Sequence, residues 1–196
     1  VGSEMCIRDR YWSKAVNTLS KRDKVLKRLI LKYNDKFLTT RKDIFYSLCK
    51  SIVGQQISVS AANSVFKKFQ KKTKKINPLK VSKLSISQLK SCGLSSQKAL
   101  GIKELSIKFV KKEFDPKLIK NMSDEEAIQY LSSLRQIGRW SAEMILLFTY
   151  NRSNIWPLQD IGLLRAISNN YKKKYFPPKS FLNKLYKKFT PYCSVA

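Results

Sequence analysis

Apolar residues recur at helical spacing along nearly the whole chain, whereas the alternation expected of half-buried strands is hard to find. Two such series predict helices that each turn one side toward a core. The first comprises Ile44, Phe45, Leu48, Cys49 and Ile52, and the second comprises Ala61, Ala62, Val65, Phe66 and Phe69. The pattern therefore predicts an all-α protein.

Other helices are marked by their ends as well as by their periodicity. Ser123 and Glu126 form an S-x-x-E capping box, which predicts that a helix begins there. Residues 140–150 are apolar on almost every face, as expected of a helix at the centre of a bundle. We expect further helices near residues 99–109, 160–170 and 179–189. Asn77-Pro78 predicts a loop, because proline disfavours helix at the residue before it.

Composition narrows the class of partner. The chain of 196 residues carries 40 Lys and Arg against 13 Asp and Glu, a formal charge of +27, which favours a polyanion such as DNA, RNA or an anionic membrane surface. No apolar run reaches the roughly eighteen residues that a bilayer helix needs, so no membrane partner is expected. This length suits one compact unit, or two small lobes that share a core.

The cysteines and the lack of histidine argue against a zinc or iron-sulfur site. Cys6, Cys49, Cys92 and Cys193 lie far apart, without a C-x-x-C pair, and the chain has no histidine. Scattered cysteines without a secretory signal fit a reducing cytoplasm, where each is more often a small core residue than a ligand.

The first ten residues, VGSEMCIRDR, resemble a translated sequencing adapter. We therefore expect residues 11–196 to form the folded protein; the alternative is a genuine flexible N-terminus.

Residues 134–142, LRQIGRWSA, form a tight connection between two predicted helices, with Gly138 where a left-handed backbone is expected. Such a hairpin presents the backbone N–H groups that open its second helix, and these can hold a DNA phosphate. Alone, a glycine turn between helices is more often only a turn. The candidate DNA-binding residues are Gln136, Ile137, Gly138, Arg139 and Ser141.

Four motifs, in order, resemble the HhH-GPD superfamily of base-excision glycosylases, and most closely its 3-methyladenine DNA glycosylase II branch. They are IVGQQISVSAA (52–62), GLSSQKA (93–99), IGRWSAEM (137–144) and WPLQDIGLLRAI (156–167). The resemblance runs from about Asp43 to Ser194. It implies two helical lobes flanking a DNA-binding cleft, and base excision repair of alkylated bases such as 3-methyladenine in double-stranded DNA, by base flipping and hydrolysis of the N-glycosidic bond.

The resemblance also implies a catalytic carboxylate. In the family an aspartate follows P-x-x at the start of a helix, and Pro157-Leu158-Gln159-Asp160 is similar to that element. Asp160 lies 160 − 138 = 22 residues after Gly138, a spacing similar to that of the family. A carboxylate there would stabilise oxocarbenium charge on the sugar or orient water. The alternative is an ordinary helix-capping aspartate.

The same resemblance also implies where the base pocket lies and whether the DNA strand is cleaved. Bifunctional members carry a lysine where this chain has Trp140, so we expect base removal without strand cleavage. Trp140, Phe189 and Met144 are the expected pocket residues, because aromatic faces attract a cationic methylated purine. Core packing is the alternative for both aromatic residues, and it is stronger for Phe189.

The wedge that fills the gap left by a flipped nucleotide is expected in the loop from Gly93 to Gln97. The matching position is Ser96, next to Ser95, while the apolar candidate is Leu94. The alternative interpretation is that Leu94 lies in the protein core.

Two departures from the family pattern concern the hairpin and the ends. Gln136 replaces the usual first glycine, which predicts strain or an altered turn. The only expected cofactor is a structural Na⁺ or K⁺ ion at the backbone carbonyls of Ser132, Leu134 and Ile137. We expect the short family architecture without the extra N-terminal domain. Residues 190–196 resemble the beginning of a final family helix, so truncation of the gene at that end is also expected.

Three alternative functions stay open: a glycosylase for oxidised or mismatched bases, a non-catalytic hairpin DNA-binding protein, and an RNA-binding module. The last has no RNP-like aromatic strand motif in its favour. We expect a monomer in the cytoplasm, associated with the bacterial nucleoid.

Overall fold

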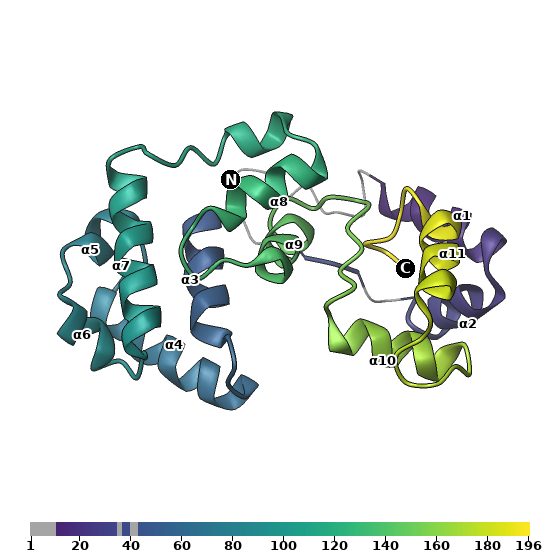
Figure 1. The fold of residues 1–196 in the computed structure, drawn as a ribbon, viewed down its shortest axis with the longest axis horizontal. Helices are drawn as coiled ribbons and strands as arrows, with labels where there is room; N and C mark the ends of the chain where they lie inside the picture. The colour runs from purple at the N-terminus through teal and green to yellow at the C-terminus, as the bar shows by residue number, and fades with distance from the viewer. Residues whose placement is uncertain (1–10, 35–36, 40–42) are drawn as a thin grey trace. The chain divides into compact units, whose positions relative to one another are not determined.

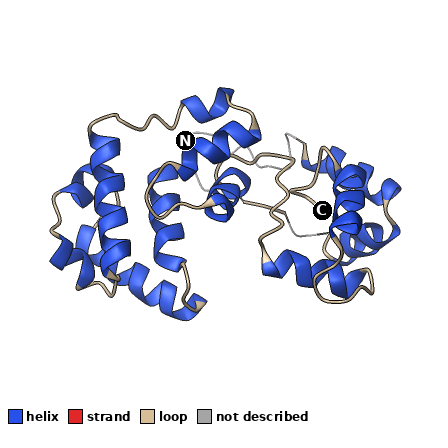
Figure 2. Cartoon of the chain, viewed as in Figure 1, coloured by secondary structure: helices blue, strands red, loops and turns tan. Residues whose placement is uncertain are grey.

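The structure is a computed structural model that describes residues 11–34, 37–39 and 43–196. Every regular element within these ranges is helical (Figure 2), which confirms the predicted all-α class. The expectation for residues 1–10 lies outside the described residues. The helices are α1 (Trp12–Arg22), α2 (Lys24–Lys32), α3 (Ile44–Gly54), α4 (Val59–Thr73), α5 (Pro78–Ser82), α6 (Ile86–Lys90), α7 (Ser96–Val110), the 3₁₀ helix η2 (Leu118–Asn121), α8 (Asp124–Ser132), α9 (Arg139–Phe148), α10 (Ile161–Asn170) and α11 (Lys179–Phe189).

The chain divides into two compact units. Unit 1 combines Val1–Thr40 with Leu146–Ala196, and unit 2 is the continuous segment Arg41–Ile145. The division falls within α9. Each unit has buried apolar residues of its own, so the two are described separately.

Unit 1 is assembled from segments that are far apart in the sequence. Helices α1 and α2 pack with α10 and α11 around a shared core. Its fully or nearly buried members are Leu19, Leu26, Leu164, Ile167, Leu182, Leu185, Phe189 and Cys193. Asp23 ends α1 and caps α2, where its carboxylate accepts from the N–H groups of Val25 and Leu26. Lys188 of α11 donates to the same carboxylate at 2.6 Å, which fastens the two segments together.

Unit 2 is arranged around α7, which packs against α3, α5 and α6 (Figure 1). Aromatic pairs extend this core: the rings of Phe45 and Phe109 lie 5.2 Å apart edge to face, and those of Phe114 and Tyr130 stack at 4.7 Å. Pairs with these geometries add attraction beyond the area they bury. The hairpin between α8 and α9 is therefore attached to a well-packed scaffold.

Most predicted helices are confirmed, and the capping box is present: the Ser123 hydroxyl accepts from the Glu126 N–H, and the Glu126 carboxylate accepts from the Ser123 N–H. The loop predicted at Asn77-Pro78 is present over residues 74–77, but it ends at Asn77 and does not include Pro78. Asn77 is extended, as the residue before proline should be, but it caps α5, and Pro78 is the first residue of that helix. On α4 the core-facing side begins later than predicted, because Ala61 is exposed while Phe66 and Phe69 are buried.

The described cysteines Cys49, Cys92 and Cys193 are free and buried, which confirms their interpretation as small core residues. A search of the described helices found none with the length and apolar character needed to cross a bilayer.

Candidate functional site

The hairpin occupies residues 133–138, between the end of α8 and the start of α9. The Ile137 N–H donates to the Leu134 carbonyl at 3.0 Å, which closes the turn. The Ala142 N–H donates to the Gly138 carbonyl at 3.0 Å, so α9 starts directly after Gly138. The first N–H groups of a helix have no acceptor within it, and they are the usual backbone donors to a phosphate.

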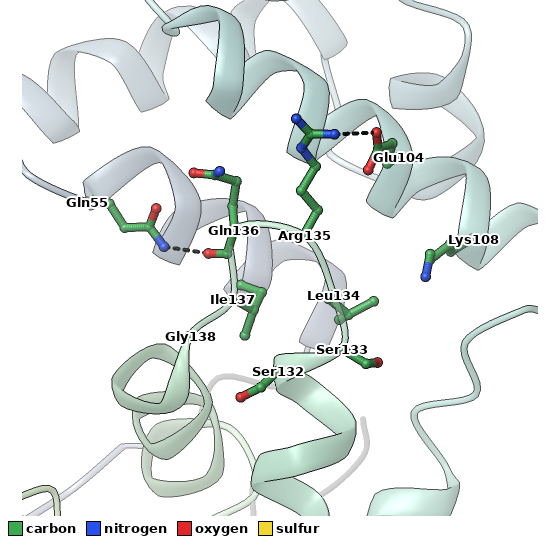
Figure 3. Close-up of a pocket in the computed structure, with 10 residues that line it drawn as sticks. All are labelled: Gln55, Glu104, Lys108, Ser132, Ser133, Leu134, Arg135, Gln136, Ile137 and Gly138. Atoms are coloured by element: carbon green, nitrogen blue, oxygen red, sulfur yellow. Dashed lines mark hydrogen bonds and ion pairs between the residues drawn. The ribbon is translucent and has the colours of Figure 1, made fainter.

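The left-handed position of this turn is Gln136, with φ of 67°, and the expectation that Gly138 would supply it is wrong. A non-glycine residue is uncommon in this region of backbone space and needs support from its surroundings. That support comes from the end of α3, where the side-chain amide of Gln55 donates to the Gln136 carbonyl at 2.6 Å (Figure 3). The same amide lies 3.4 Å from the Ser141 hydroxyl.

Gln55 is itself held in place by a side chain of α7, in addition to its contacts with the hairpin and with Ser141 of α9. The Lys98 ammonium of α7 donates to the Gln55 carbonyl at 2.6 Å and to the Val53 carbonyl at 2.9 Å. A cation at the C-terminus of a helix also interacts favourably with the helix dipole, here that of α3. Desolvation lowers the pKa of Lys98. Three helices thus fix the backbone at Gln136.

A cavity of about 650 Å³ lies against the hairpin. The residues that line it are Gln55, Glu104, Lys108 and the whole of Ser132–Gly138 (Figure 3). The Ser132 hydroxyl is buried without a hydrogen-bond partner in the described part of the chain. The oxygens that Ser132, Leu134 and Ile137 offer are all neutral. Such a donor set fits a monovalent cation, and a Na⁺ or K⁺ ion at the three carbonyls stays a prediction.

Arg139, the first residue of α9, is bound by two carboxylates. Its guanidinium makes a bidentate pair with Glu125 at 2.7 and 2.8 Å, and its Nε lies 3.2 Å from Glu143. Glu143 is only 5 % exposed, and its second oxygen has no hydrogen-bond partner among the described residues. Burial raises the pKa of Glu143, and Arg139 opposes that rise. The side chain of Arg139 is therefore engaged within unit 2.

The remaining hairpin candidates differ in what they expose. Ile137 and Ser141 are buried, so their side chains support the turn and cannot contact DNA in this arrangement. Gly138 is exposed. Arg135, beside the candidates, is paired with Glu104 at 3.0 Å. The backbone of the hairpin, rather than its side chains, is the part that remains available for a phosphate.

Trp140 and Met144 lie one turn apart on α9, so their side chains share a face of the helix. Trp140 is 38 % exposed, an unusual position for a residue with so much apolar surface, and Met144 is half-buried. The structure thus brings these two pocket candidates together in unit 2.

Asp160 lies in unit 1 and is the N-cap of α10, where its carboxylate accepts from the Leu163 N–H at 2.9 Å. Asp160 is therefore a helix-capping aspartate, as the alternative interpretation stated. Capping does not exclude catalysis, because the same carboxylate can serve both. Gly162 makes room for this carboxylate, since a Cβ built on it would lie 2.9 Å from Asp160 Oδ1.

Phe189 does not resemble a base-stacking residue. It is 2 % exposed, belongs to the core of unit 1, and packs edge to face against Trp156 with ring centroids 6.1 Å apart. Its place on the amphipathic helix α11 explains this burial, which favours core packing over a role in the pocket.

The wedge candidates also separate. Leu94 is 4 % exposed, which favours the core position that was its alternative over the role of an apolar wedge. Ser95 caps α7 and Ser96 begins it, and both are exposed. These two serines remain candidates.

A protein-family model matches residues 49–191, which is more than half of the chain, and its description is the HhH-GPD superfamily of base excision DNA repair proteins. The chain belongs to this superfamily. The matched HhH-GPD segment contains the hairpin, Trp140 and Asp160.

Individual relatives agree with this membership. The HhH-GPD chain is 26 % identical to DNA-3-methyladenine glycosylase 1 of Schizosaccharomyces pombe over 160 residues, covering 80 % of this chain and 68 % of that protein. It is 26 % identical to an alkylbase DNA glycosidase-like protein of the same organism over 196 residues, covering 96 % and 92 %. Among solved structures, the S. pombe 3-methyladenine DNA glycosylase in complex with abasic DNA matches with a TM-score of 0.79 at 24 % identity, covering 93 % of this chain and 92 % of that one, which shows a common fold.

Sequence reasoning missed the residues that support the hairpin from outside it, namely Gln55, Lys98 and Glu143. Gln55 lies in the IVGQQISVSAA motif, and that motif was the only available signal for it. Glu143 was detectable as a lone acidic residue within the apolar segment 140–150. Lys98 lies in the GLSSQKA motif, and that motif was the only available signal for it, because its role depends on a contact between helices.

Proposed function

We propose that this chain is a monofunctional DNA glycosylase that removes alkylated bases, such as 3-methyladenine, from double-stranded DNA by hydrolysis of the N-glycosidic bond. The observation that carries the proposal is the match to the HhH-GPD family across the segment that contains both the hairpin and the Pro-x-x-Asp element. The names of the S. pombe relatives support alkylated bases as the substrate class.

Asp160 carries the chemistry in this proposal. Cleavage of the N-glycosidic bond builds positive charge on the sugar, and a fixed carboxylate stabilises that charge or orients the attacking water. The cap hydrogen bond from Leu163 and the space left by Gly162 hold the carboxylate in one orientation. Such fixed orientation lowers the cost of reorganisation when the transition state forms.

Trp140 determines the type of product. An indole has no amine that could form a Schiff base with the sugar, so excision ends at an abasic site and the strand stays intact. The half-exposed indole and Met144 form an apolar, polarisable face. A methylated purine carries positive charge, and its attraction to an aromatic face amounts to about 0.5–2 kcal/mol.

The hairpin would bind the DNA backbone. Its exposed Gly138 and the N–H groups that open α9 suit a phosphate, which positions the duplex without reading its sequence. We further propose that the protein acts as a monomer in the cytoplasm, which the free buried cysteines support.

The deciding experiment compares the wild type with Asp160→Asn on methylated duplex DNA, and measures free-base release together with strand nicks before and after alkali. Asparagine is an equally good N-cap residue, so the variant should melt with the wild type. We expect release of 3-methyladenine to fall by about 10²–10⁴-fold in the variant, and nicks to appear only after alkali.

Other outcomes assign other functions. Unchanged release by Asp160→Asn would remove the catalytic role of this residue, and nicks before alkali would reveal lyase activity. Tight DNA binding without release on any lesion would indicate a non-catalytic hairpin protein. Release of 8-oxoguanine or a mismatched base alone would indicate a different glycosylase.

A further inference from the structure

The charge of unit 2 is distributed unevenly along the chain. No aspartate or glutamate lies between Asp43 and Glu104, although lysines recur throughout that stretch. Helices α3, α4, α5 and α6 and the first half of α7 lie within it. Apart from Asp43, the acidic residues of the unit follow afterwards, from Glu104 to Glu143. An anionic partner is therefore attracted more strongly to the first half of the unit than to the second.

Helix α4 gathers part of this charge on one face. Lys67, Lys68, Lys71 and Lys72 are spaced so that they form two adjacent ridges of the helix, and all four are exposed. Phe66, Phe69 and Thr73 are buried on the opposite side. Within the described ranges no residue makes an ion pair with any of the four lysines. Their charge is thus uncompensated.

The first two turns of α4 carry no charged side chain in line with the lysines. The exposed residues Val59 and Asn63 precede Lys67 on one ridge, and the exposed residues Ser60 and Ser64 precede Lys68 on the other. A duplex lying along this helix would therefore meet only uncharged side chains before it reached the ammonium groups.

The two arginines at the hairpin, unlike these lysines, are paired with carboxylates. Arg139 is shared between Glu125 and Glu143, and Arg135 is paired with Glu104. A phosphate that approached either guanidinium would have to displace a carboxylate or accept its repulsion. The hairpin therefore contributes backbone donors but little free positive charge.

The lysine face borders the loop that leads into α7. Burial raises the pKa of the Cys92 thiol in that loop, and the charges of Lys72 and Lys68 oppose that rise. A Cβ on Gly93 would lie 3.2 Å from Val65 of α4, so helix and loop are in direct contact. Ser95 and Ser96, the remaining wedge candidates, follow in the same loop.

We propose that Lys67, Lys68, Lys71 and Lys72 form a phosphate-binding surface for duplex DNA beside the loop 91–95. This surface, rather than the hairpin arginines, supplies the salt-dependent part of DNA binding by unit 2. It rests on the proposed function, which makes duplex DNA the polyanion. Lysine suits the task, because its ammonium is a mobile point charge that binds phosphates irrespective of sequence.

The test measures the dissociation constant for an unmodified duplex as a function of salt. The variant Lys68→Gln/Lys72→Gln removes two charges from the α4 surface. The control Lys117→Gln/Lys120→Gln removes two charges from exposed lysines of the η2 segment, among the acidic residues. Arg139→Gln tests the hairpin.

The expected result is that the slope of log affinity against log salt falls by about 0.9 for each phosphate that the α4 variant no longer neutralises. The control and Arg139→Gln should keep the slope of the wild type. Thermal melting verifies that each variant is folded. Equal decreases of the slope in the α4 variant and in the control would mean that only net charge matters, and would overturn the proposal. A larger decrease of the slope in Arg139→Gln than in the α4 variant would also overturn it.

Two further outcomes separate this inference from the proposed function. Base release by the wild type combined with an unchanged slope in the α4 variant would overturn the surface and leave the glycosylase intact. A lower slope in the α4 variant, combined with no base release by the wild type, would support the surface and overturn the proposed glycosylase activity. If the α4 variant loses affinity only for single-stranded RNA, the surface serves RNA and the proposal is wrong.

Discussion

Gly101 of α7 lies directly against the side chain of Gln136 in the hairpin: a Cβ built on Gly101 would be 2.8 Å from Gln136 Cγ and 3.3 Å from Gln136 Cβ. The two residues belong together, because the missing Cβ of one accommodates the side chain of the other. Gln136 stands where the resembled family has a glycine, and a glycine in the facing helix provides the space for it.

The variant Gly101→Ala should therefore destabilise unit 2, although alanine is the better helix former by about 1 kcal/mol. We expect the steric conflict with Gln136 to outweigh that gain and to cost about 1–3 kcal/mol, as overpacking does in other cores. Chemical denaturation measures the destabilisation. The double variant Gly101→Ala/Gln136→Gly should recover most of it, since Gln136→Gly removes the clashing atoms and suits the positive φ. Additive effects in this cycle would contradict the coupling.

The support from Gln55 can be tested in the same way. Gln55→Ala removes the donor to the Gln136 carbonyl, and we expect a loss of about 1–2 kcal/mol in unfolding free energy with weaker binding to duplex DNA. Gln70→Ala, at an exposed position of α4, is the matched control and should change neither. If both variants behave like the wild type, the hydrogen bond at 2.6 Å does not hold the hairpin.

Gly162→Ala should lower activity without a gain in stability. Alanine favours helix formation by up to about 1 kcal/mol at this exposed position of α10. Its Cβ, however, would lie 2.9 Å from Asp160 Oδ1, the oxygen that accepts the cap hydrogen bond from Leu163, and would push the carboxylate aside. Loss of a cap costs about 0.5–2 kcal/mol, which offsets the gain in helix propensity. Displacement of a catalytic group by a fraction of an ångström commonly reduces the rate of the chemical step, and we expect about a tenfold lower single-turnover rate of base release without a higher melting temperature. Ala166→Gly on the same helix is the control, and it should lower the melting temperature and leave the rate unchanged.

The ion pair between the buried Asp23 and the partly exposed Lys188 should make unit 1 sensitive to acid. Burial raises the pKa of Asp23, but the hydrogen bond from Lys188 and the N–H of Leu26 outweigh it and hold the pKa below its usual value. A carboxyl with a lowered folded-state pKa contributes stability above its unfolded-state pKa of about 4, and that contribution disappears as the pH falls through the folded-state value. Asp23→Asn keeps the cap and removes the charge.

We therefore expect Asp23→Asn to lose about 1–2 kcal/mol of unfolding free energy between pH 5 and 8, and the difference from the wild type to shrink below pH 4. Denaturation curves at several pH values measure this difference. A difference that stays constant down to pH 2 would mean that packing, rather than the ion pair, is responsible.

The sequence was sufficient for the elements whose signals are local. The Ser123–Glu126 capping box fixed the start of α8, and apolar spacing located α9, α10 and α11 to within about two residues. Helices α1 and α2 were not predicted, although both are amphipathic. The helix at Pro78 was missed because proline interrupts a helix but also favours its first position.

The site was harder to predict, because its geometry depends on contacts between distant segments. The left-handed turn was assigned to Gly138 on the preference of glycine, whereas Gln55 and Gly101 stabilise it at Gln136. Periodicity placed Phe189 on an apolar helix face but could not distinguish a core that covers this face from a pocket that exposes it. Leu94 shows the same ambiguity, since a leucine in a short loop has the same sequence signal whether it is buried or presented to DNA.

The discontinuity of unit 1 has a consequence for the synthesis of the protein on the ribosome. Leu19 and Leu26 leave the exit tunnel first, but the residues that cover them, including Leu182 and Phe189, are translated more than 150 residues later, since 182 − 26 = 156. Unit 2 is one continuous segment and can form its core while synthesis continues. The apolar faces of α1 and α2 therefore stay uncovered until those later residues have been synthesised. How well chaperones shield these faces in the meantime would limit the yield of active protein in the cell.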